Sequence, residues 1–120
     1  MTNFANLEAV NILKNALWHL RTYGWKQGSA GYYGGPSCII GAITEVAHRM
    51  RPPSYYDDGL TSCFASTMAG SKAESIAIYA LKFEAPLHDI VAYNDDPNRT
   101  FSDIEELFER AIAKLESPES

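Results

Sequence analysis

The stretch SDIEELFERAIAKL, residues 102–115, is the clearest helical segment of the chain and decides its fold class. Its apolar residues recur every three or four positions, the spacing of one face of an α-helix. These residues are Ile104, Leu107, Phe108, Ala111, Ile112 and Leu115. Ser102 and Glu105 have the spacing of a capping box, in which each side chain bonds the backbone N–H of the other. We therefore expect an amphipathic helix that begins at Ser102, followed by a frayed tail over residues 116–120.

Two more helices are expected in the first half of the chain. One runs from residue 7 to residue 23, with Asn6 as its N-cap and Gly24 as the residue that ends it. The other runs from residue 37 to residue 50 and begins with Ser37, whose hydroxyl suits an N-cap.

The second half of the chain is expected to add shorter helices. A capping box formed by Ser71 and Glu74 opens a helix over residues 71–83. Further helical patterns cover residues 61–69 and residues 87–93, and the second of these predicts buried side chains at Ile90 and Val91. Alternating strand patterns are scarce, so the fold class is all-α.

Length and composition agree with one globular domain. The chain has 120 residues, of which 46% are hydrophobic and 21% are charged, and these fractions are ordinary for a globular protein. A chain of this length buries enough surface to need no metal or disulfide. We expect a compact single domain over residues 1–120, built as a bundle of four to five helices around one core.

Several classes of function are disfavoured by composition. No apolar run approaches the roughly 18 residues that a membrane-spanning helix needs, and no secretory signal is visible, so we expect a cytoplasmic protein without membrane contact. The formal net charge of −5 disfavours general binding to DNA or RNA. Cys38 and Cys63 are too few for a disulfide framework and too far apart for a metal knuckle, so we expect free thiols, no metal and no cofactor. The oligomeric state is left open.

Two loops carry most of the candidate functional residues. They are residues 24–42, GWKQGSAGYYGGPSCIIGA, and residues 93–100, YNDDPNRT, so a long glycine- and aromatic-rich loop follows the first helix. Loops of this composition carry binding and catalysis more often than scaffold elements do. The side chains proposed to bind a ligand or partner are Trp25, Gln27, Tyr32, Tyr33, Asn94, Asp95, Arg99 and Thr100.

The second loop has two interpretations. In one, Arg99 grips a phosphate while the N–H groups at the start of the following helix supply further donors. In the other, which the sequence favours, Asn and Asp residues close turns, Thr100 or Ser102 caps the helix, and Arg99 pairs with Asp95 or Asp96 or bonds loop carbonyls.

Cys38 also has two interpretations. The start of a helix favours a thiolate, so Cys38 is a candidate nucleophile, with His88 as base and Asn94 orienting the ring. A cysteine beside two isoleucines is more often a small buried apolar residue. No signature of a known enzyme accompanies Cys38, which makes an enzyme the less favoured class.

Three short motifs together resemble a known family. They are GWKQG at residues 24–28, Cys-x-x-Gly-Ala at residues 38–42 and Asn-Asp-x-x-x-Arg-Thr at residues 94–100. Their order and spacing are similar to those of a family of small uncharacterised bacterial and phage proteins, described as a domain of unknown function. The resemblance implies a compact helical domain, often phage-borne, and carries over no activity. The chain departs from the family at Tyr93, where an indole is common.

The motif positions in this chain are Trp25, Gln27, Cys38, Gly41, Asn94, Asp95, Arg99 and Thr100. Taken together, the sequence favours a small non-enzymatic binding protein whose 24–42 and 93–100 loops lie side by side and recognise a host protein or a small anionic ligand. One alternative is a small cysteine-dependent enzyme that uses Cys38. Another is an acidic inhibitor that mimics nucleic acid.

Overall fold

A computed structural model of the chain describes residues 4–28, 35–49 and 71–117. In these residues the chain forms five α-helices and one short 3-10 turn, which confirms the all-α class. The elements are α1 (Phe4–Tyr23), α2 (Ile39–Arg49), α4 (Ser71–Glu84), η2 (Pro86–His88), α5 (Ile90–Asp95) and α6 (Phe101–Glu116). This part of the chain has no strand, only an isolated parallel bridge between Trp25 and Ser37.

Some expectations lie outside the described residues. These are the helix over residues 61–69, the second cysteine Cys63, and the middle of the glycine- and aromatic-rich loop with Tyr32 and Tyr33. None of the described helices is both long and apolar enough to cross a membrane.

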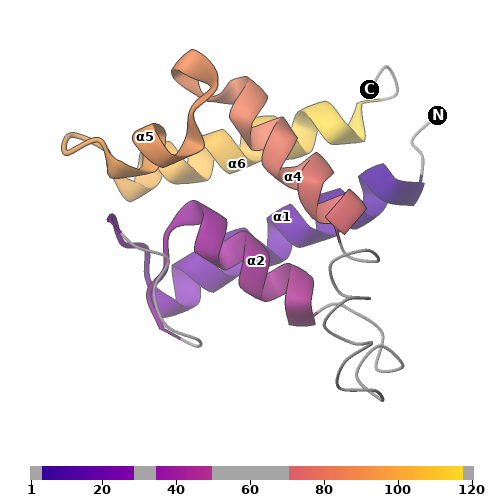
Figure 1. Ribbon diagram of the computed structural model, residues 1–120, viewed down its shortest axis with the longest axis horizontal. Helices are drawn as coiled ribbons and strands as arrows, with labels where there is room; N and C mark the ends of the chain where they lie inside the picture. The colour runs from indigo at the N-terminus through magenta and orange to yellow at the C-terminus, as the bar shows by residue number, and fades with distance from the viewer. Residues whose placement is uncertain (1–3, 29–34, 50–70, 118–120) are drawn as a thin grey trace.

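The central helix is α1, which packs against α2, α4 and α6 (Figure 1). Helix α4 packs against α6 as well, and α2 contacts α5. The segment that leaves α1 and the turn between α5 and α6 lie at the same end of the molecule, on the left in Figure 1. The fold thereby brings together two segments that are far apart in the sequence.

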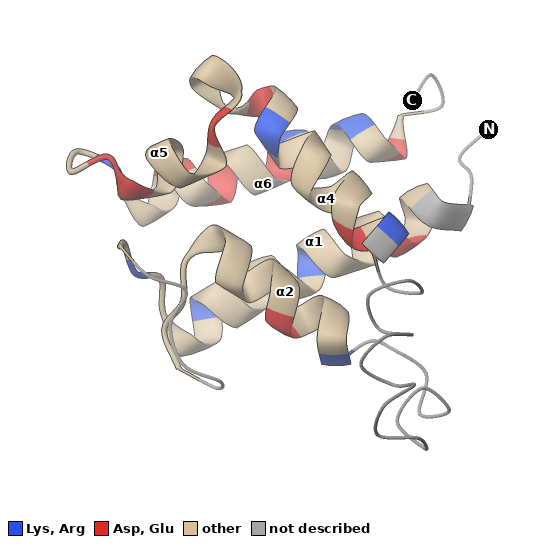
Figure 2. Cartoon of the chain, viewed as in Figure 1, with Lys and Arg blue, Asp and Glu red and all other residues tan. Residues whose placement is uncertain are grey.

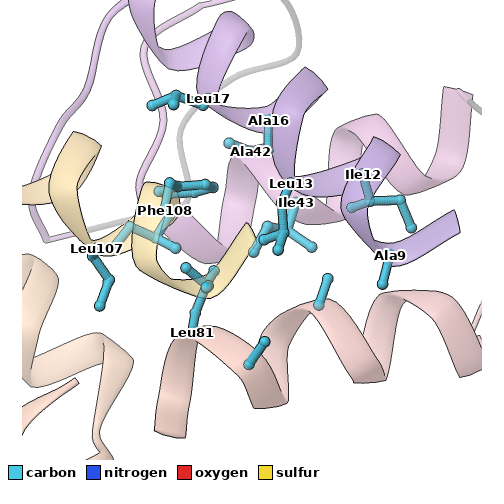
Figure 3. Close-up of a cluster of buried hydrophobic side chains, with 14 of the residues drawn as sticks. Ala9, Ile12, Leu13, Ala16, Leu17, Ala42, Ile43, Leu81, Leu107 and Phe108 are labelled. Carbon is cyan, nitrogen blue, oxygen red and sulfur yellow. The ribbon is translucent and has the colours of Figure 1, made fainter. Parts of the chain in front are cut away.

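One apolar core holds the four long helices together. Leu13 of α1, Ile43 of α2, Leu81 of α4 and Phe108 of α6 are all completely buried. Figure 3 shows these side chains meeting at the centre of the bundle, with alanines of α1 and α2 where the helices approach closely. Burial of a side chain of this size contributes roughly 2 to 3 kcal/mol.

The first helix starts earlier than its sequence signals indicate. Asn6, expected as the N-cap, lies inside α1, because residues 4 and 5 already belong to the helix. The expected end is confirmed at Gly24, which has φ of +108° and donates its N–H to the Leu20 carbonyl over 3.0 Å. A residue with a side chain at position 24 would place its Cβ 3.4 Å from the Pro36 side chain. It would also have to adopt a left-handed backbone conformation, which is unfavourable for any residue except glycine.

The expected Ser37 cap on α2 is wrong. Ser37 pairs its backbone with the segment after α1, through its N–H to the Gly24 carbonyl and its carbonyl to the Lys26 N–H. Its buried hydroxyl has no hydrogen-bond partner among the described residues. Because this pairing keeps Ser37 extended, the cap moves one residue along to Cys38, whose Sγ accepts the Gly41 N–H over 3.3 Å.

The short helix expected over residues 87–93 is divided in two. Leu87 and His88 have φ of +59° and +54°, a conformation that side-chain-bearing residues rarely adopt, and the helix cannot pass through them. Helix α5 begins afresh after Asp89, whose carboxylate accepts the Ala92 N–H over 3.0 Å. Ile90 is buried as expected, but Val91 is 59% exposed, which corrects the expectation of burial.

The capping box of α6 lies two residues earlier than expected. Thr100, not Ser102, is the N-cap, and Asp103, not Glu105, completes the box. The sequence TFSDIE offers the same spacing twice, and the earlier start brings Phe101 into the helix, where its ring packs against the core. Glu105 is then available to accept a 2.7 Å bond from Arg21 of α1.

The two possible caps of α6 are separated by a pair of matched substitutions. Thr100→Ala should lower the free energy of unfolding by about 1 kcal/mol, because the Asp103 N–H loses its acceptor. Ser102→Ala should change it by less than about 0.5 kcal/mol, as exposed substitutions away from caps usually do. Urea unfolding followed by circular dichroism measures both, and a larger loss in Ser102→Ala would show the cap to be assigned wrongly.

Candidate functional site

The two loops of interest meet in space. The Gln27 amide donates to the Asn94 carbonyl over 3.0 Å and to the Asp96 carbonyl over 2.6 Å. The backbone N–H of Gly28 donates to the Asp95 carboxylate over 2.9 Å. Residues 24–28 therefore lie directly against residues 94–96, as the sequence led us to expect.

The side chain of Asn94 lies at the centre of this contact. Its Oδ1 accepts the indole N–H of Trp25 over 2.8 Å and the backbone N–H of Ile39 over 3.0 Å. Its Nδ2 donates to the Lys26 carbonyl over 3.2 Å and to the Asp95 carboxylate over 2.9 Å. The amide therefore makes two bonds as acceptor and two as donor, which is its full capacity.

We call this contact the Asn94 junction and define it by its bonded residues. They are Trp25, Lys26, Gln27, Gly28, Ile39, Asn94, Asp95 and Asp96. Asn94 is only 2% exposed, so its bonds form away from water. The Ile39 N–H is one of the groups that the first turn of a helix leaves without an intrahelical partner. Asn94 therefore caps α2 from a distant part of the chain.

Trp25 is fixed on two sides. Its indole N–H bonds Asn94, and its ring lies tilted against Phe101 of α6 with 6.4 Å between ring centroids. An aromatic side chain with a polar tip suits this position, because the ring packs on the core while the N–H finds an acceptor.

Asp95 is exposed, and its carboxylate is favoured by the junction. The backbone N–H of Gly28 and, to a smaller extent, the side-chain amide of Asn94 hold the pKa of Asp95 below its ordinary value of 3.8. The carboxylate is therefore ionised at neutral pH.

Arg99 is held by its own loop. Its Nε donates to the Tyr93 carbonyl over 2.9 Å, and its guanidinium lies 3.6 Å from the centre of the Tyr93 ring. Carboxylate oxygens of Asp96 and Asp103 lie 3.5 and 3.9 Å from its terminal nitrogens. Together with the Thr100 cap, these contacts agree with the turn-closing interpretation of the second loop.

The three residues of the suggested cysteine site have different neighbours. Cys38 directs its Sγ to the Gly41 N–H, and Asn94 uses its whole amide within the junction. The His88 ring contacts the end of α4, where Nδ1 lies 3.2 Å from the Lys82 carbonyl and the ring packs on Phe83. The described contacts bring Cys38 and Asn94 to one place and leave His88 out.

An open hollow of about 220 Å³ lies beside the junction, between the start of α2 and α5. We call it the junction hollow. It is lined by Gly28, Cys38, Ile40, Ile90, Val91, Asn94 and Asp95. Its three apolar members were not among the sequence candidates, because each resembles an ordinary core position in a helical pattern.

A second polar cluster lies inside the bundle and was not identified from the sequence. His19 is completely buried, with Nδ1 3.1 Å from the Arg49 guanidinium and Nε2 3.0 Å from the Glu45 carboxylate. An arginine only donates, so Nδ1 accepts and, in the neutral ring, Nε2 carries the proton. The Glu45 oxygen does not lie in line for a hydrogen bond to Nε2. The sequence feature that could have indicated this cluster is the position of His19 on the apolar face of α1.

The described residues contain no group of three His, Cys, Asp or Glu side chains suited to one metal ion.

Comparison with known proteins gives one positive result. Residues 5–114 match a family model described as Family of unknown function (DUF6197). The chain belongs to this family. No curated protein and no solved structure matches the chain. The matched span includes every residue of the Asn94 junction.

Asn94→Ala should destabilise the protein strongly. The substitution leaves the Ile39 N–H, which is buried, and the Trp25 N–H and Lys26 carbonyl, which are partly buried, without their partner. A buried group without a partner costs about 1 to 3 kcal/mol. We expect a loss of about 3 kcal/mol or more in chemical unfolding. Asn98→Ala, in the exposed turn four residues later, is the matched control and should stay within about 0.5 kcal/mol. Equal effects of the two substitutions would contradict the assigned role of Asn94.

Asp95 should make stability depend on acid pH. A carboxyl group whose pKa is lower in the folded state stabilises the fold above its unfolded pKa, and this contribution is lost as the pH falls through the folded pKa. For Asp95 the loss should begin as the pH approaches 3.8 and be complete below the lowered folded value.

Asp95→Asn should therefore lose less thermal stability than the wild type when the pH is lowered from about 5 to about 3. The exposed Glu109→Gln serves as the control and should follow the wild-type profile. Melting temperatures measured across this range test the expectation, which fails if wild type and Asp95→Asn give parallel curves.

Proposed function

We propose that this chain is a small non-enzymatic binding protein that recognises a protein partner at the junction hollow. One observation carries the proposal. The polar groups of the junction are bonded to one another, whereas the apolar side chains of Ile40, Ile90 and Val91 border an open space beside them. Val91 is 59% exposed and Ile40 is partly exposed, whereas Ile90 is buried, so Val91 forms most of the accessible part of this border.

The junction also supports the proposal through its rigidity. Trp25, Gln27 and Asn94 hold residues 24–28 against residues 94–96 before any partner arrives. A binding surface that is already ordered loses little conformational freedom on association, which leaves more of the contact energy for affinity.

The charge around the hollow suggests the chemistry of the partner. Asp95 lines the hollow as a carboxylate, and Asp89 and Asp96 flank the same short helix. Figure 2 shows these acidic segments at both ends of α5. An apolar side chain next to a lysine or arginine complements an apolar hollow with an acidic edge. If the chain is phage-borne, as the resemblance implies, the partner that presents this apolar side chain and its basic neighbour would be a host protein.

A small anionic ligand receives less support. The sequence assigned its recognition to Arg99, whose guanidinium lies against the Tyr93 ring and near the carboxylates of Asp96 and Asp103. An anion would have to compete with both carboxylates for the same group.

The two remaining alternatives are also less well supported. A cysteine enzyme needs a base beside Cys38, and the contacts of His88 are with the end of α4. An acidic mimic of nucleic acid needs a continuous acidic surface, but Glu105, Glu106 and Glu116 each lie beside an arginine or lysine.

The proposal is tested with a peptide array and two matched variants. The array presents peptides with one large apolar residue flanked by Lys or Arg, next to a parallel set flanked by Asp or Glu. We expect the wild type to bind the basic set, and Val91→Lys to weaken this binding about tenfold or more, since it removes apolar surface and adds a like charge. Leu7→Lys, at a similarly exposed apolar position on α1, should bind like the wild type.

Two results would overturn the proposal. One is the absence of binding to the basic set. The other is binding that Val91→Lys leaves unchanged. A shift of the Arg99 side-chain resonances on addition of inorganic phosphate, without peptide binding, would favour the anionic ligand instead.

A further inference from the structure

A larger groove lies on another side of the molecule, between α4 and the C-terminal part of α6. Its volume is about 500 Å³, and its surface is formed mainly by Ile76, Tyr79, Ala80, Phe83 and Leu115. We call it the α4–α6 groove. None of these residues belongs to the Asn94 junction or to the motifs of the sequence.

Two aromatic side chains that line this groove are largely exposed to solvent. Tyr79 is 66% exposed and Phe83 is 51% exposed, and they lie one helical turn apart on α4. Single exposed apolar residues are common on proteins, but neighbouring aromatic rings along an apolar groove are typical of recognition surfaces. The groove residues of α4 run from Ser75 to Phe83, about 12 Å along the helix axis. This length matches two turns of a helix laid into the groove.

Lysines lie at or near the groove although the whole chain is acidic. Lys114 of α6 lines the groove, and its Nζ lies 3.4 Å from the centre of the Phe83 ring. On α4, Lys72 and Lys82 are exposed, and helical periodicity places them on the same face as Tyr79. Figure 2 shows Lys and Arg segments in blue on both α4 and the last turns of α6.

Two acidic residues of these helices have partners on other helices. Glu74 of α4 reaches Thr44 of α2, and Glu116 of α6 pairs with Lys14 of α1. The groove therefore combines an apolar floor with Lys114 as the charged residue among its lining residues, and with Lys72 and Lys82 on the same face of α4 as Tyr79.

We propose that the α4–α6 groove docks an acidic amphipathic helix of a partner protein. Apolar residues of that helix, spaced at i, i+3, i+4 and i+7, would occupy the space between Tyr79, Phe83 and Leu115. Its aspartates and glutamates would meet the lysines at or near the groove. A second copy of this chain does not readily supply such a helix, because the acidic amphipathic helix α6 has its apolar face buried in its own core.

The test selects ligands from a displayed library of helical peptides on the intact chain. The enriched peptides should share an apolar face flanked by Asp and Glu. Their affinity, measured by fluorescence anisotropy, should fall about tenfold or more for Tyr79→Ser/Phe83→Ser and for Lys82→Glu/Lys114→Glu. It should also weaken as salt is raised from about 0.05 to about 0.5 M, since the contacts with these lysines are exposed.

Two controls separate this groove from the other charged and apolar surfaces. Arg21→Glu reverses one charge on α1, where its partner Glu105 does not line the groove, and should bind like the wild type, as should Val91→Lys at the junction hollow. If the enriched peptides lose affinity for Val91→Lys and not for the groove variants, they bind at the junction hollow. This result would refute the proposed role of the α4–α6 groove and would leave the proposed function of the hollow intact.

Other outcomes also overturn the proposal. They are the enrichment of basic peptides, the absence of any enriched helical peptide, self-association of the chain through α4 in sedimentation, and flotation with anionic phosphatidylserine vesicles in place of peptide binding.

Discussion

The carboxamide of Asn94 joins parts of the chain that the core alone does not connect. Through four hydrogen bonds it links the segment after α1, the start of α2 and the end of α5. Because the side chain is almost completely buried, each of these bonds replaces one that water would otherwise supply, and the loss of the amide would leave several polar groups unsatisfied. The apolar core fixes the four long helices, and the junction fixes residues 24–28 and the start of α2 against the end of α5.

The long helices were predictable because burial imposes a period on their sequence. The apolar positions of α6 and α1 repeat every three to four residues, and the completely buried Leu13, Leu107 and Phe108 lie on those faces. Helix ends were less predictable, because several residues before α2 and α6 have side chains suited to capping. The choice between Thr100 and Ser102 depends on where Phe101 packs, and Ser37 is withdrawn from capping by its backbone pairing with Gly24 and Lys26.

The junction itself was predictable only in outline. The composition of the two loops indicated that Trp25, Gln27, Asn94 and Asp95 belong together, and they do contact one another. No sequence rule gives a bond between residues almost 70 positions apart, such as that from Trp25 to Asn94, because it arises from how α1, α2 and α5 are packed. The same limit explains why the accessible apolar surfaces were missed. Val91, Tyr79 and Phe83 fit a helical apolar pattern, and only the packing decides that they face water.

The central claim is that Asn94 holds the segment after α1 and the start of α2 to the end of α5 as firmly as the core holds the helices. Native-state hydrogen exchange of the Trp25 indole N–H and the Ile39 backbone N–H tests this claim most directly, since both donate to the same Asn94 oxygen. We predict protection of both groups at a free energy close to that of core amides such as Leu107. Exchange of either group at the rate of an exposed loop would contradict the claim.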